Sequence, residues 1–421
     1  MLDLTMRSHP LRAALSAEMH VRRLPRIGSP CRLMQAVTLF GEGAAGTGRA
    51  HIEALGIAAG APIAAGARYA VLPLGDLTLV WEGHTEFATY TLIRTGAFED
   101  PFDPDHFSAA DEMLGELPGQ IIRATQIAVL ARGAPELDRP ALEAMFKARA
   151  LIVCEVAGGA AQLMSDFMLH DDGYGRLLIK DIGLEGDETS QLVTRVQELG
   201  NYRNMALLGL PVAQSLTPEI TALERRLSAV THQVSERSAS NETLLDELSF
   251  VSAELARLAA ATRYRMSATQ AYGQLSFERL ASLEIATLRG FQTLADFTER
   301  RLVPALRTCE SFSRRIDDLQ QRAAWTSSLL RTTVDIALAV QNRDLLASMD
   351  KRTEAQLRLQ HAVEGLSVVA ISYYIVSLLG YVFGGTHFVD HDVALAIAVP
   401  VVLAIAWAAL TLFRRGLKGE R

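Results

Sequence analysis

Cysteine is scarce in this chain of 421 residues, which carries three, at positions 31, 154 and 309. Three widely separated cysteines suit neither a disulfide framework nor a cysteine-ligated metal cluster. We therefore expect Cys31, Cys154 and Cys309 to be reduced core residues in a reducing compartment. The stretch 1–15 also lacks the apolar segment of a signal peptide, so we expect no such peptide.

An excess of positive charge is also absent, because the formal net charge is −7. Domains that bind nucleic acid usually carry a basic surface, so we expect no nucleic-acid partner. The glycines at 41, 43, 46 and 48 are not followed by Gly-Lys-Ser or Gly-Lys-Thr, and the stretch indicates a flexible loop. No nucleophile elbow or catalytic triad pattern is present, so the sequence does not indicate an enzyme.

Two long apolar runs, 365–383 and 393–413, stand near the C-terminus. Each is close to the roughly 20 apolar residues with which a helix spans a bilayer. Only a helix satisfies the backbone polar groups of such a segment within lipid. The alternative is a buried hairpin in a soluble core, where paired runs of this length are rare. We expect a two-helix transmembrane hairpin over 363–413, with the lipid bilayer as a partner.

The distribution of positive charge predicts how the hairpin is oriented. The loop at 384–392 contains no Lys or Arg. Basic residues remain on the cytoplasmic side, so we expect both termini in the cytoplasm, an outward-facing loop and a basic cytoplasmic tail at 414–421. The flanking basic residues are Lys351, Arg352 and Arg358 before the first run and Arg414, Arg415, Lys418 and Arg421 after the second.

The first 210 residues alternate between strand and helix patterns. The stretch 69–94 is the best β region, because it is rich in Val, Leu, Thr and aromatic residues around a Gly75-Asp76 turn. We therefore expect a cytoplasmic α/β domain over 1–210. The expected strands are 31–40, 69–72, 77–81, 85–94, 120–130, 151–156, 162–169 and 177–182, and the expected helices are 10–19, 49–55, 103–117 and 189–207.

Beyond Pro211 and Pro218 the pattern changes to heptads. Eleven positions between Leu223 and Leu258 alternate in steps of four and three, and all are apolar except Arg237 and Asn241. One interpretation is a coiled coil between chains. The other is a helical hairpin within one chain, with its turn at Tyr272-Gly273. We expect a helical stalk over 217–362, with a break at Pro304. The predicted fold class is thus α+β: the cytoplasmic domain, the coiled-coil-like stalk and the transmembrane hairpin.

The strongest candidate for a chemical site is the stretch from Trp81 to Phe87. On a continuous strand, Glu82, His84 and Glu86 share one face. Two carboxylates and an imidazole could bind a divalent metal or perform acid–base chemistry. The alternative is a solvated or salt-bridged polar face. A divalent metal at these residues is the one cofactor that the sequence suggests.

The first apolar run carries two further groups of candidate residues. Ser377, Gly380 and Gly384 form a face of small residues that lets helices pack closely, which favours a homo-oligomer. Glu364 stands at the cytoplasmic lip of the run, where it either faces an aqueous path or marks the interface. A polar face that could line a pore is formed by Ser367, Tyr374, Ser377 and Tyr381.

The order of cytoplasmic domain, helical stalk, two spans and short outward loop resembles the cobalt–magnesium channel superfamily. In that superfamily the first span ends in Tyr-Gly-Met-Asn, which forms the pore mouth. This chain has Gly380-Tyr381-Val382-Phe383-Gly384 at the corresponding place and lacks the Met-Asn pair. The resemblance implies a cation channel, and the absent pair argues against ion selection of that type.

Five stretches spread over almost the whole chain carry a second resemblance: His9-Pro10-Leu11-Arg12, Trp81-Glu82-Gly83-His84-Thr85-Glu86-Phe87, Tyr202-Arg203-Asn204-Met205-Ala206-Leu207-Leu208, Gln356-Leu357-Arg358-Leu359-Gln360 and Val363-Glu364-Gly365-Leu366-Ser367. In these stretches the chain is similar to a bacterial family of uncharacterised, membrane-anchored proteins, a domain of unknown function. The resemblance implies a membrane anchor and a proteobacterial origin, and hence the bacterial inner membrane, but no activity.

Two functions remain open at this point. The first is an oligomeric, membrane-anchored scaffold or regulator whose cytoplasmic domain binds a ligand or partner. The second is a two-span divalent-cation channel or transporter. The absent Met-Asn pair favours the first.

Overall fold

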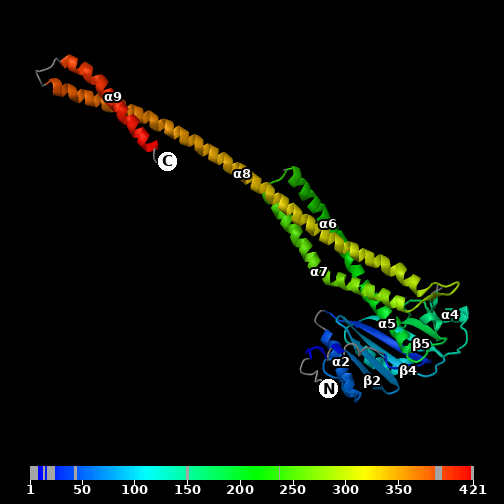
Figure 1. The fold of residues 1–421 in the computed structure, drawn as a ribbon. Coiled ribbons are helices and arrows are strands. Elements are labelled where there is room, and N and C mark those ends of the chain that lie inside the picture. The colour runs from blue at the N-terminus through cyan, green and yellow to red at the C-terminus, as the bar shows by residue number, and fades with distance from the viewer. Residues whose placement is uncertain are drawn as a thin grey trace. The chain divides into compact units, whose positions relative to one another are not determined.

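The computed structural model describes residues 8–12, 15–16, 24–41, 45–147, 151–236, 238–384 and 391–418. Two compact units divide the chain, Met1–Thr326 and Ser327–Arg421. The first unit contains a β-sheet and the helices packed on it, and the second contains the remainder of the longest helix and one further helix (Figure 1). The predicted boundaries near 210 and 362 are not tested by this division and stay predictions.

The described part of the first unit contains a nine-stranded mixed sheet in the order β2-β3-β4-β1-β5-β8-β7-β6-β9. All neighbouring strands are antiparallel except β5 and β8. The predicted α+β class is confirmed, although antiparallel meanders replace the expected α/β alternation. The strands are β1 (Cys31–Leu39), β2 (Tyr69–Leu74), β3 (Leu77–Gly83), β4 (Phe87–Thr95), β5 (Gln120–Leu130), β6 (Ile152–Val156), β7 (Ala161–Ser165), β8 (Gly175–Asp181) and β9 (Ala286–Thr287).

Helices cover both faces of this sheet. Alternate residues of a strand point to opposite faces, so Leu33 of β1 packs in one cluster with Val193 of α5 (Glu188–Leu207). Its neighbour Met34 packs in another cluster, with Ile52 of α2 (Ala45–Ala58). The remaining short helices of this unit are η2 (Pro104–Ala110), α3 (Asp111–Gly115), α4 (Arg139–Met145) and η3 (Ala157–Gly159). β1 is an interior strand paired with β4 and β5, and because both of its faces are covered, none of its residues is exposed.

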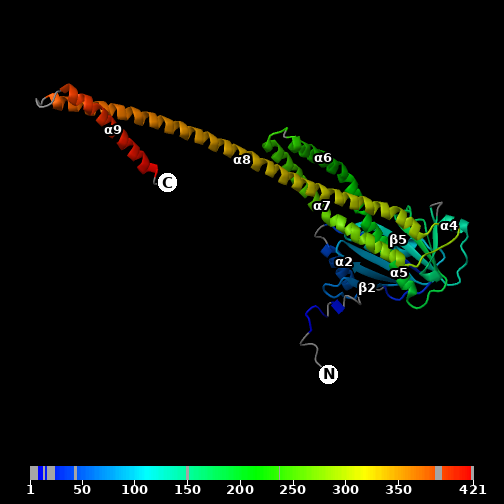
Figure 2. The ribbon, with the colours of Figure 1, turned by 45° about the horizontal axis from the view of Figure 1, so that its top comes forward.

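The heptad positions lie on a helical pair within one chain. α6 (Gly209–Glu236) and α7 (Asn241–Ser282) pack side by side (Figure 2). All nine apolar heptad positions are buried: Leu223, Leu227, Val230, Val234, Leu244, Leu248, Val251, Leu255 and Leu258. The predicted turn at Tyr272-Gly273 is wrong, because α7 continues through it. α6 instead ends at Glu236 and α7 begins at Asn241, and Ser240 caps the N-terminus of α7 by accepting a hydrogen bond from the Thr243 backbone.

The longest helix, α8, spans Leu294–Gly384 and contains Pro304. The predicted break at Pro304 is therefore wrong. Within the first unit, α8 packs on the α6–α7 pair, where Arg315 donates to Thr221 at 3.1 Å and to Glu224 at 2.8 Å. Cys309 of α8 is buried, as are Cys31 and Cys154, and all three are free, which confirms the prediction of reduced core cysteines.

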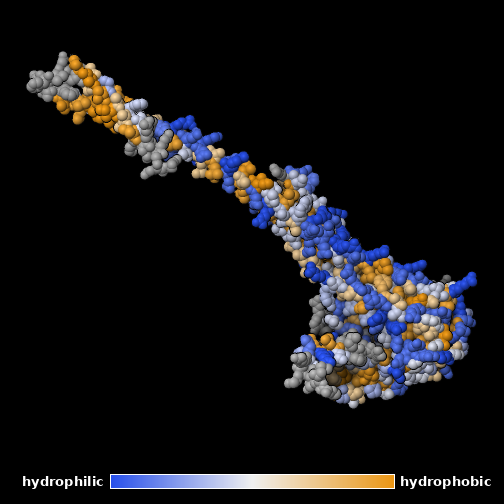
Figure 3. Space-filling view, in the orientation of Figure 1, coloured by the Kyte–Doolittle hydropathy of each residue, from blue (hydrophilic) through white to orange (hydrophobic). Residues whose placement is uncertain are grey.

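The second unit contains residues 327–384 of α8 and α9 (His391–Lys418). Among the described residues, one helix, Leu294–Val382, is long and apolar enough over part of its length to cross a membrane. A shorter apolar segment covers Ala396–Ala409. Figure 3 shows the hydrophobic surface at the end of α8 and on α9. The two-helix transmembrane hairpin and its orientation stay predictions, and the expected outward loop at 384–392 lies mostly outside the described residues.

Candidate functional site

The predicted polar face of Glu82, His84 and Glu86 does not form. β3 ends at Gly83 and β4 begins at Phe87, so His84 and Glu86 lie in the turn between the strands and not on a continuous strand. In this turn His84 donates its backbone N–H to the Phe87 carbonyl at 2.8 Å. The two predicted strands, 77–81 and 85–94, are observed as β3 and β4, but the continuous strand that would align the three side chains is absent, because the chain turns between them.

The three side chains also have separate surroundings. The Glu86 carboxylate accepts from both terminal nitrogens of Arg265 on α7, at 3.0 and 3.3 Å. His84 stacks on Phe87, with ring centroids 4.2 Å apart, and lies 3.7 Å from Glu82. Among the residues that the structure describes, no three His, Cys, Asp or Glu side chains gather as a metal site. Metal binding here stays a prediction, and the geometry gives it no support.

The candidate membrane residues all lie on α8, with Gly384 as its last residue. Ser367 donates to the Val363 carbonyl at 2.8 Å, and Glu364 accepts from Gln360 at 3.1 Å. The side chains of Tyr374 and Tyr381 are exposed. Their predicted roles at a pore or lip, and those of Ser377, Gly380 and Gly384 in packing, stay predictions.

A cavity of about 410 Å³ offers a better candidate site in the first unit. It lies where the parallel strands β5 and β8 begin, between α5 and the loop 166–174. Its volume is within the range of small-molecule sites. Three arginines line it, Arg123 of β5, Arg176 of β8 and Arg203 of α5, together with apolar side chains from the same elements. We call it the arginine cavity.

Arg123 is held against α5 by neutral groups. Its guanidinium donates to Gln35 Oε1 at 2.8 Å and to Asn201 Oδ1 at 2.9 Å. The guanidinium lies against the backbone of Gly200, because a Cβ added there would stand 2.6 Å from Arg123 Cζ. Gln35 also donates to Thr91 of β4 at 3.1 Å, which fixes its amide with the oxygen toward Arg123. These contacts orient the cation but leave its charge unneutralised.

Arg203 lies in a stack of cations and aromatic rings. Its guanidinium carbon is 5.0 Å from the ring centroid of Phe167, and that ring stacks on Phe297 of α8 at 4.7 Å. Arg301 lies over the other ring, 4.3 Å from its centroid. Such contacts are favourable for each cation. They also bring the first turns of α8 against the loop that borders the cavity.

The electrostatics of the cavity are unbalanced. Burial, and to a smaller extent the nearby charge of Arg203, lower the pKa of Arg123 to about 9. Burial and then the charge of Arg301 lower the pKa of Arg203 to about 10. Both groups remain protonated at neutral pH. In the described part of the chain neither forms an ion pair, whereas Arg176 pairs with Asp172 at 3.1 Å.

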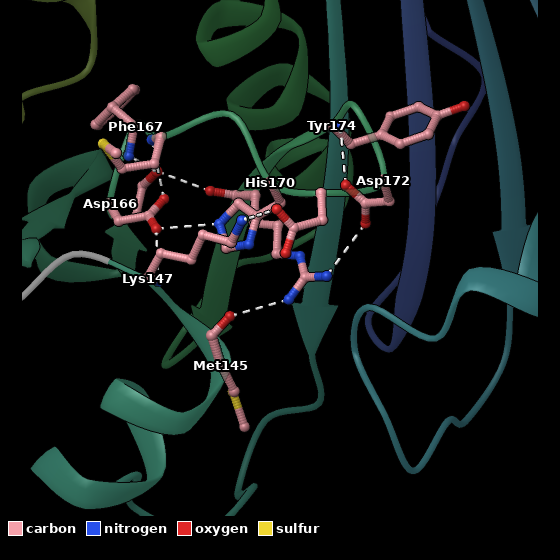
Figure 4. A network of polar contacts seen from close by, with 11 residues as sticks. Met145, Lys147, Asp166, Phe167, His170, Asp172 and Tyr174 are labelled. Carbon is pink, nitrogen blue, oxygen red and sulfur yellow. Dashed lines mark hydrogen bonds and ion pairs between the residues drawn. The ribbon is translucent and has the colours of Figure 1, made fainter.

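The loop 166–174 is fixed by a network of polar contacts (Figure 4). The buried side chains of Asp166 and His170 lie 3.0 Å apart. The same carboxylate accepts backbone N–H groups from Lys147 at 2.9 Å and from Met168 at 3.1 Å. The network holds Phe167 at φ 50°, a conformation that costs an aromatic residue about 1–3 kcal/mol. Strain of this kind, maintained beside a cavity, is typical of a functional site.

Sequence reasoning assigned no role to these residues. The signal for Arg123 is its period-two spacing from Thr125 and the apolar Ile127 within β5, which places all three on the face toward α5. Arg203 belongs to the stretch 202–208, whose sequence indicated only a resemblance to a family and no binding site. The cavity brings together residues from four parts of the chain, namely β5, the stretch 165–177, α5 and the start of α8, and single-sequence patterns do not predict such contacts.

Two comparisons with known proteins bear on the identity of this chain. The comparison with curated proteins gives no match. The predicted resemblance to a family of uncharacterised proteins is confirmed in its coarse form, without the membrane anchor. Residues 7–417 match the family described as "Protein of unknown function (DUF3422)", and the chain belongs to that family.

Proposed function

We propose that the first unit binds a small anion in the arginine cavity, and that the chain acts as a membrane-anchored regulator or scaffold. The observation that carries the proposal is the pair Arg123 and Arg203, two guanidinium groups that line one cavity without a carboxylate partner among the described residues.

The physical reason is the cost of burying like charges together. A partly buried charge is stable when an opposite charge or several hydrogen bonds compensate for lost solvation. Here the amide oxygens of Gln35 and Asn201 compensate one guanidinium, and aromatic rings compensate the other. A carboxylate or phosphate would supply the missing charge, and guanidinium groups bind both through paired hydrogen bonds.

Thermal unfolding of the full chain with added phosphate or succinate tests this proposal. A ligand that binds the folded state alone stabilises it by about 2.7 kcal/mol at a concentration 100 times its dissociation constant. Arg203→Met should abolish this shift. The ligand-free variant should be as stable as the wild type or more stable, because one of two repelling cations is removed.

Arg289→Met is the matched control, since Arg289 is exposed and lies outside the cavity. It should keep the full anion-induced shift. An equal shift in Arg203→Met and wild type would show that the anion acts elsewhere, and no shift in the wild type would contradict the proposal.

We place the second unit in the bacterial inner membrane, with both termini cytoplasmic. The apolar window of α8 is almost entirely exposed, which suits lipid, and basic residues flank the two apolar runs but not the loop between them. Reporter fusions at residue 1 and after Arg415 should indicate the cytoplasm, and an insertion at Thr386 should indicate the outside. A cytoplasmic signal at Thr386 would exclude the hairpin topology.

A divalent-cation channel or transporter is the competing proposal. Ser367, Tyr374 and Tyr381 recur every seven residues on α8 and are exposed, so they could line a path between packed copies. Native mass spectrometry distinguishes the channel from the regulator or scaffold, because a pore lined by the apolar segments of α8 needs several copies of the chain. A monomer or dimer would leave the regulator or scaffold as the proposal.

A further inference from the structure

The arginine cavity has an apolar side that a small anion would leave unoccupied. Val196 and Leu199 of α5, and Leu294 of α8, form part of its wall. Three further lining residues are exposed although they are large and apolar: Ile121 is 56% exposed, Met168 49% and Leu169 71%. Charged and apolar groups therefore line the same cavity.

The exposed residues occupy fixed positions. Ile121 is in β5, where it pairs with Thr38 of β1. Met168 donates its backbone N–H to Asp166 at 3.1 Å, and Leu169 lies between Met168 and the buried His170. The polar network of the loop therefore holds the apolar side chains of Met168 and Leu169 at the cavity, although their exposure to water is unfavourable.

We infer that the ligand is an amphiphilic anion with one alkyl chain, an inference that rests on the proposed anion site. Its carboxylate or phosphate binds Arg123 and Arg203, and its chain lies along Leu199 and Leu294 toward Met168 and Leu169. A free fatty acid and a single-chain phospholipid share this chemistry. A cavity of about 410 Å³ provides space for such a chain beside the headgroup.

Chain length gives the sharpest test of this inference. Burial of one methylene group strengthens binding by about fourfold. The full chain, kept in solution by an amphipathic polymer, is titrated calorimetrically with acetate, butyrate, hexanoate and octanoate. Affinity should rise by about two- to fourfold for each methylene until the cavity is filled. Alkyl phosphates of the same lengths distinguish a phospholipid-like headgroup from a fatty-acid carboxylate.

The outcomes separate this inference from the proposed function. If all chain lengths bind equally, the alkyl inference is overturned and the anion site remains. If no anion binds, both are overturned. Alkyltrimethylammonium ions of the same lengths should not bind; equal binding would show that the polymer or an apolar surface takes up the chain without the arginines.

Variants locate the chain on the protein. Met168→Ser and Leu169→Ser should each reduce the dependence of affinity on chain length. Ile57→Ser is the matched control, because Ile57 is 73% exposed but lies on α2, away from the cavity. An unchanged dependence in both Met168→Ser and Leu169→Ser would overturn the placement of the chain at this cavity.

Discussion

Glu86 in the β3–β4 turn accepts hydrogen bonds from both terminal nitrogens of Arg265 on α7, at 3.0 and 3.3 Å. The carboxylate is only 8% exposed and the guanidinium 21%. The pair joins the sheet to a helix that lies 179 residues later in the chain. It also occupies one of the carboxylates that the sequence suggested for metal binding.

Arg265→Met should destabilise the protein by about 2–4 kcal/mol, because it leaves a buried carboxylate without its partner. Glu86→Gln in the same background should restore part of the loss, since it removes the unpaired charge. Chemical denaturation measures both. Arg257→Met breaks an ion pair in which the guanidinium is 54% exposed and should cost less than about 1 kcal/mol. An equal loss of unfolding free energy in Arg265→Met and Arg257→Met would show that the buried ion pair stabilises the fold no more than the exposed one.

Gly200→Ala provides a second prediction, about the arginine cavity itself. In an ordinary helix this change stabilises by about 1 kcal/mol. Here the new methyl group would stand 2.6 Å from Arg123 Cζ and displace the guanidinium from Asn201. We expect lower stability and weaker anion binding, measured by thermal unfolding with and without phosphate.

Gly46→Ala on α2 is the control, because nothing lies within 4 Å of its added Cβ. It should not reduce stability. If Gly200→Ala is also neutral or stabilising, Arg123 does not need its observed position.

The sequence predicted individual elements well where hydrophobic periodicity decides them. Strand β5 was predicted with its observed bounds, and α5 within one residue. The packing of one helix against another was predicted less well from the sequence. The heptad spacing correctly marked the buried positions of α6 and α7, but the polar position Asn241 is the first residue of α7 and does not lie inside a continuous seam.

Glycine and proline explain the remaining errors in the helical region. Gly273 was interpreted as a turn, but a Cβ there would stand 2.7 Å from Leu306, so the glycine permits close packing of α7 against α8. Pro304 lies inside α8 without ending it. Glycine can form a turn or allow close helix packing, and proline can end a helix or lie within one, and tertiary packing decides which of these occurs. The arginine cavity depends on the same long-range packing, and no local pattern predicts it.

Glu198 on α5 supplies a prediction about pH. Burial raises its pKa above the ordinary 4.5, and Arg279, 2.5 Å away, offsets only part of this effect. The folded state then binds the proton more tightly than the unfolded state. The resulting stability is complete below about pH 4.5 and is lost as pH rises through the raised pKa. The unfolding free energy of the wild type, relative to Glu198→Gln, should therefore fall as pH rises from 4.5.

Glu247 serves as the control, because its contribution to the unfolding free energy should change with pH in the opposite direction. Its hydrogen bonds to Arg226 lower its pKa below 4.5. The stability that it contributes is present above that value and is lost as pH falls through the lowered pKa. Urea denaturation of the wild type and both Gln variants, from about pH 3 to pH 7, covers the pH ranges in which the two trends occur. Parallel trends would contradict the assignment of either shift.

The face of Ser377, Gly380 and Gly384 supplies the last prediction, which concerns assembly. We propose that α8 segments from different copies pack through this face, because small residues let helix backbones approach closely in lipid. Gly380→Leu and Gly384→Leu should each reduce the oligomer mass measured by light scattering in detergent. Val382→Leu is the control: at about 100° per residue it lies roughly opposite Gly380 on the helix, and it should leave the mass unchanged. The same mass in all three variants would exclude this face as the contact, and a loss in Val382→Leu alone would place the contact on the opposite side of α8.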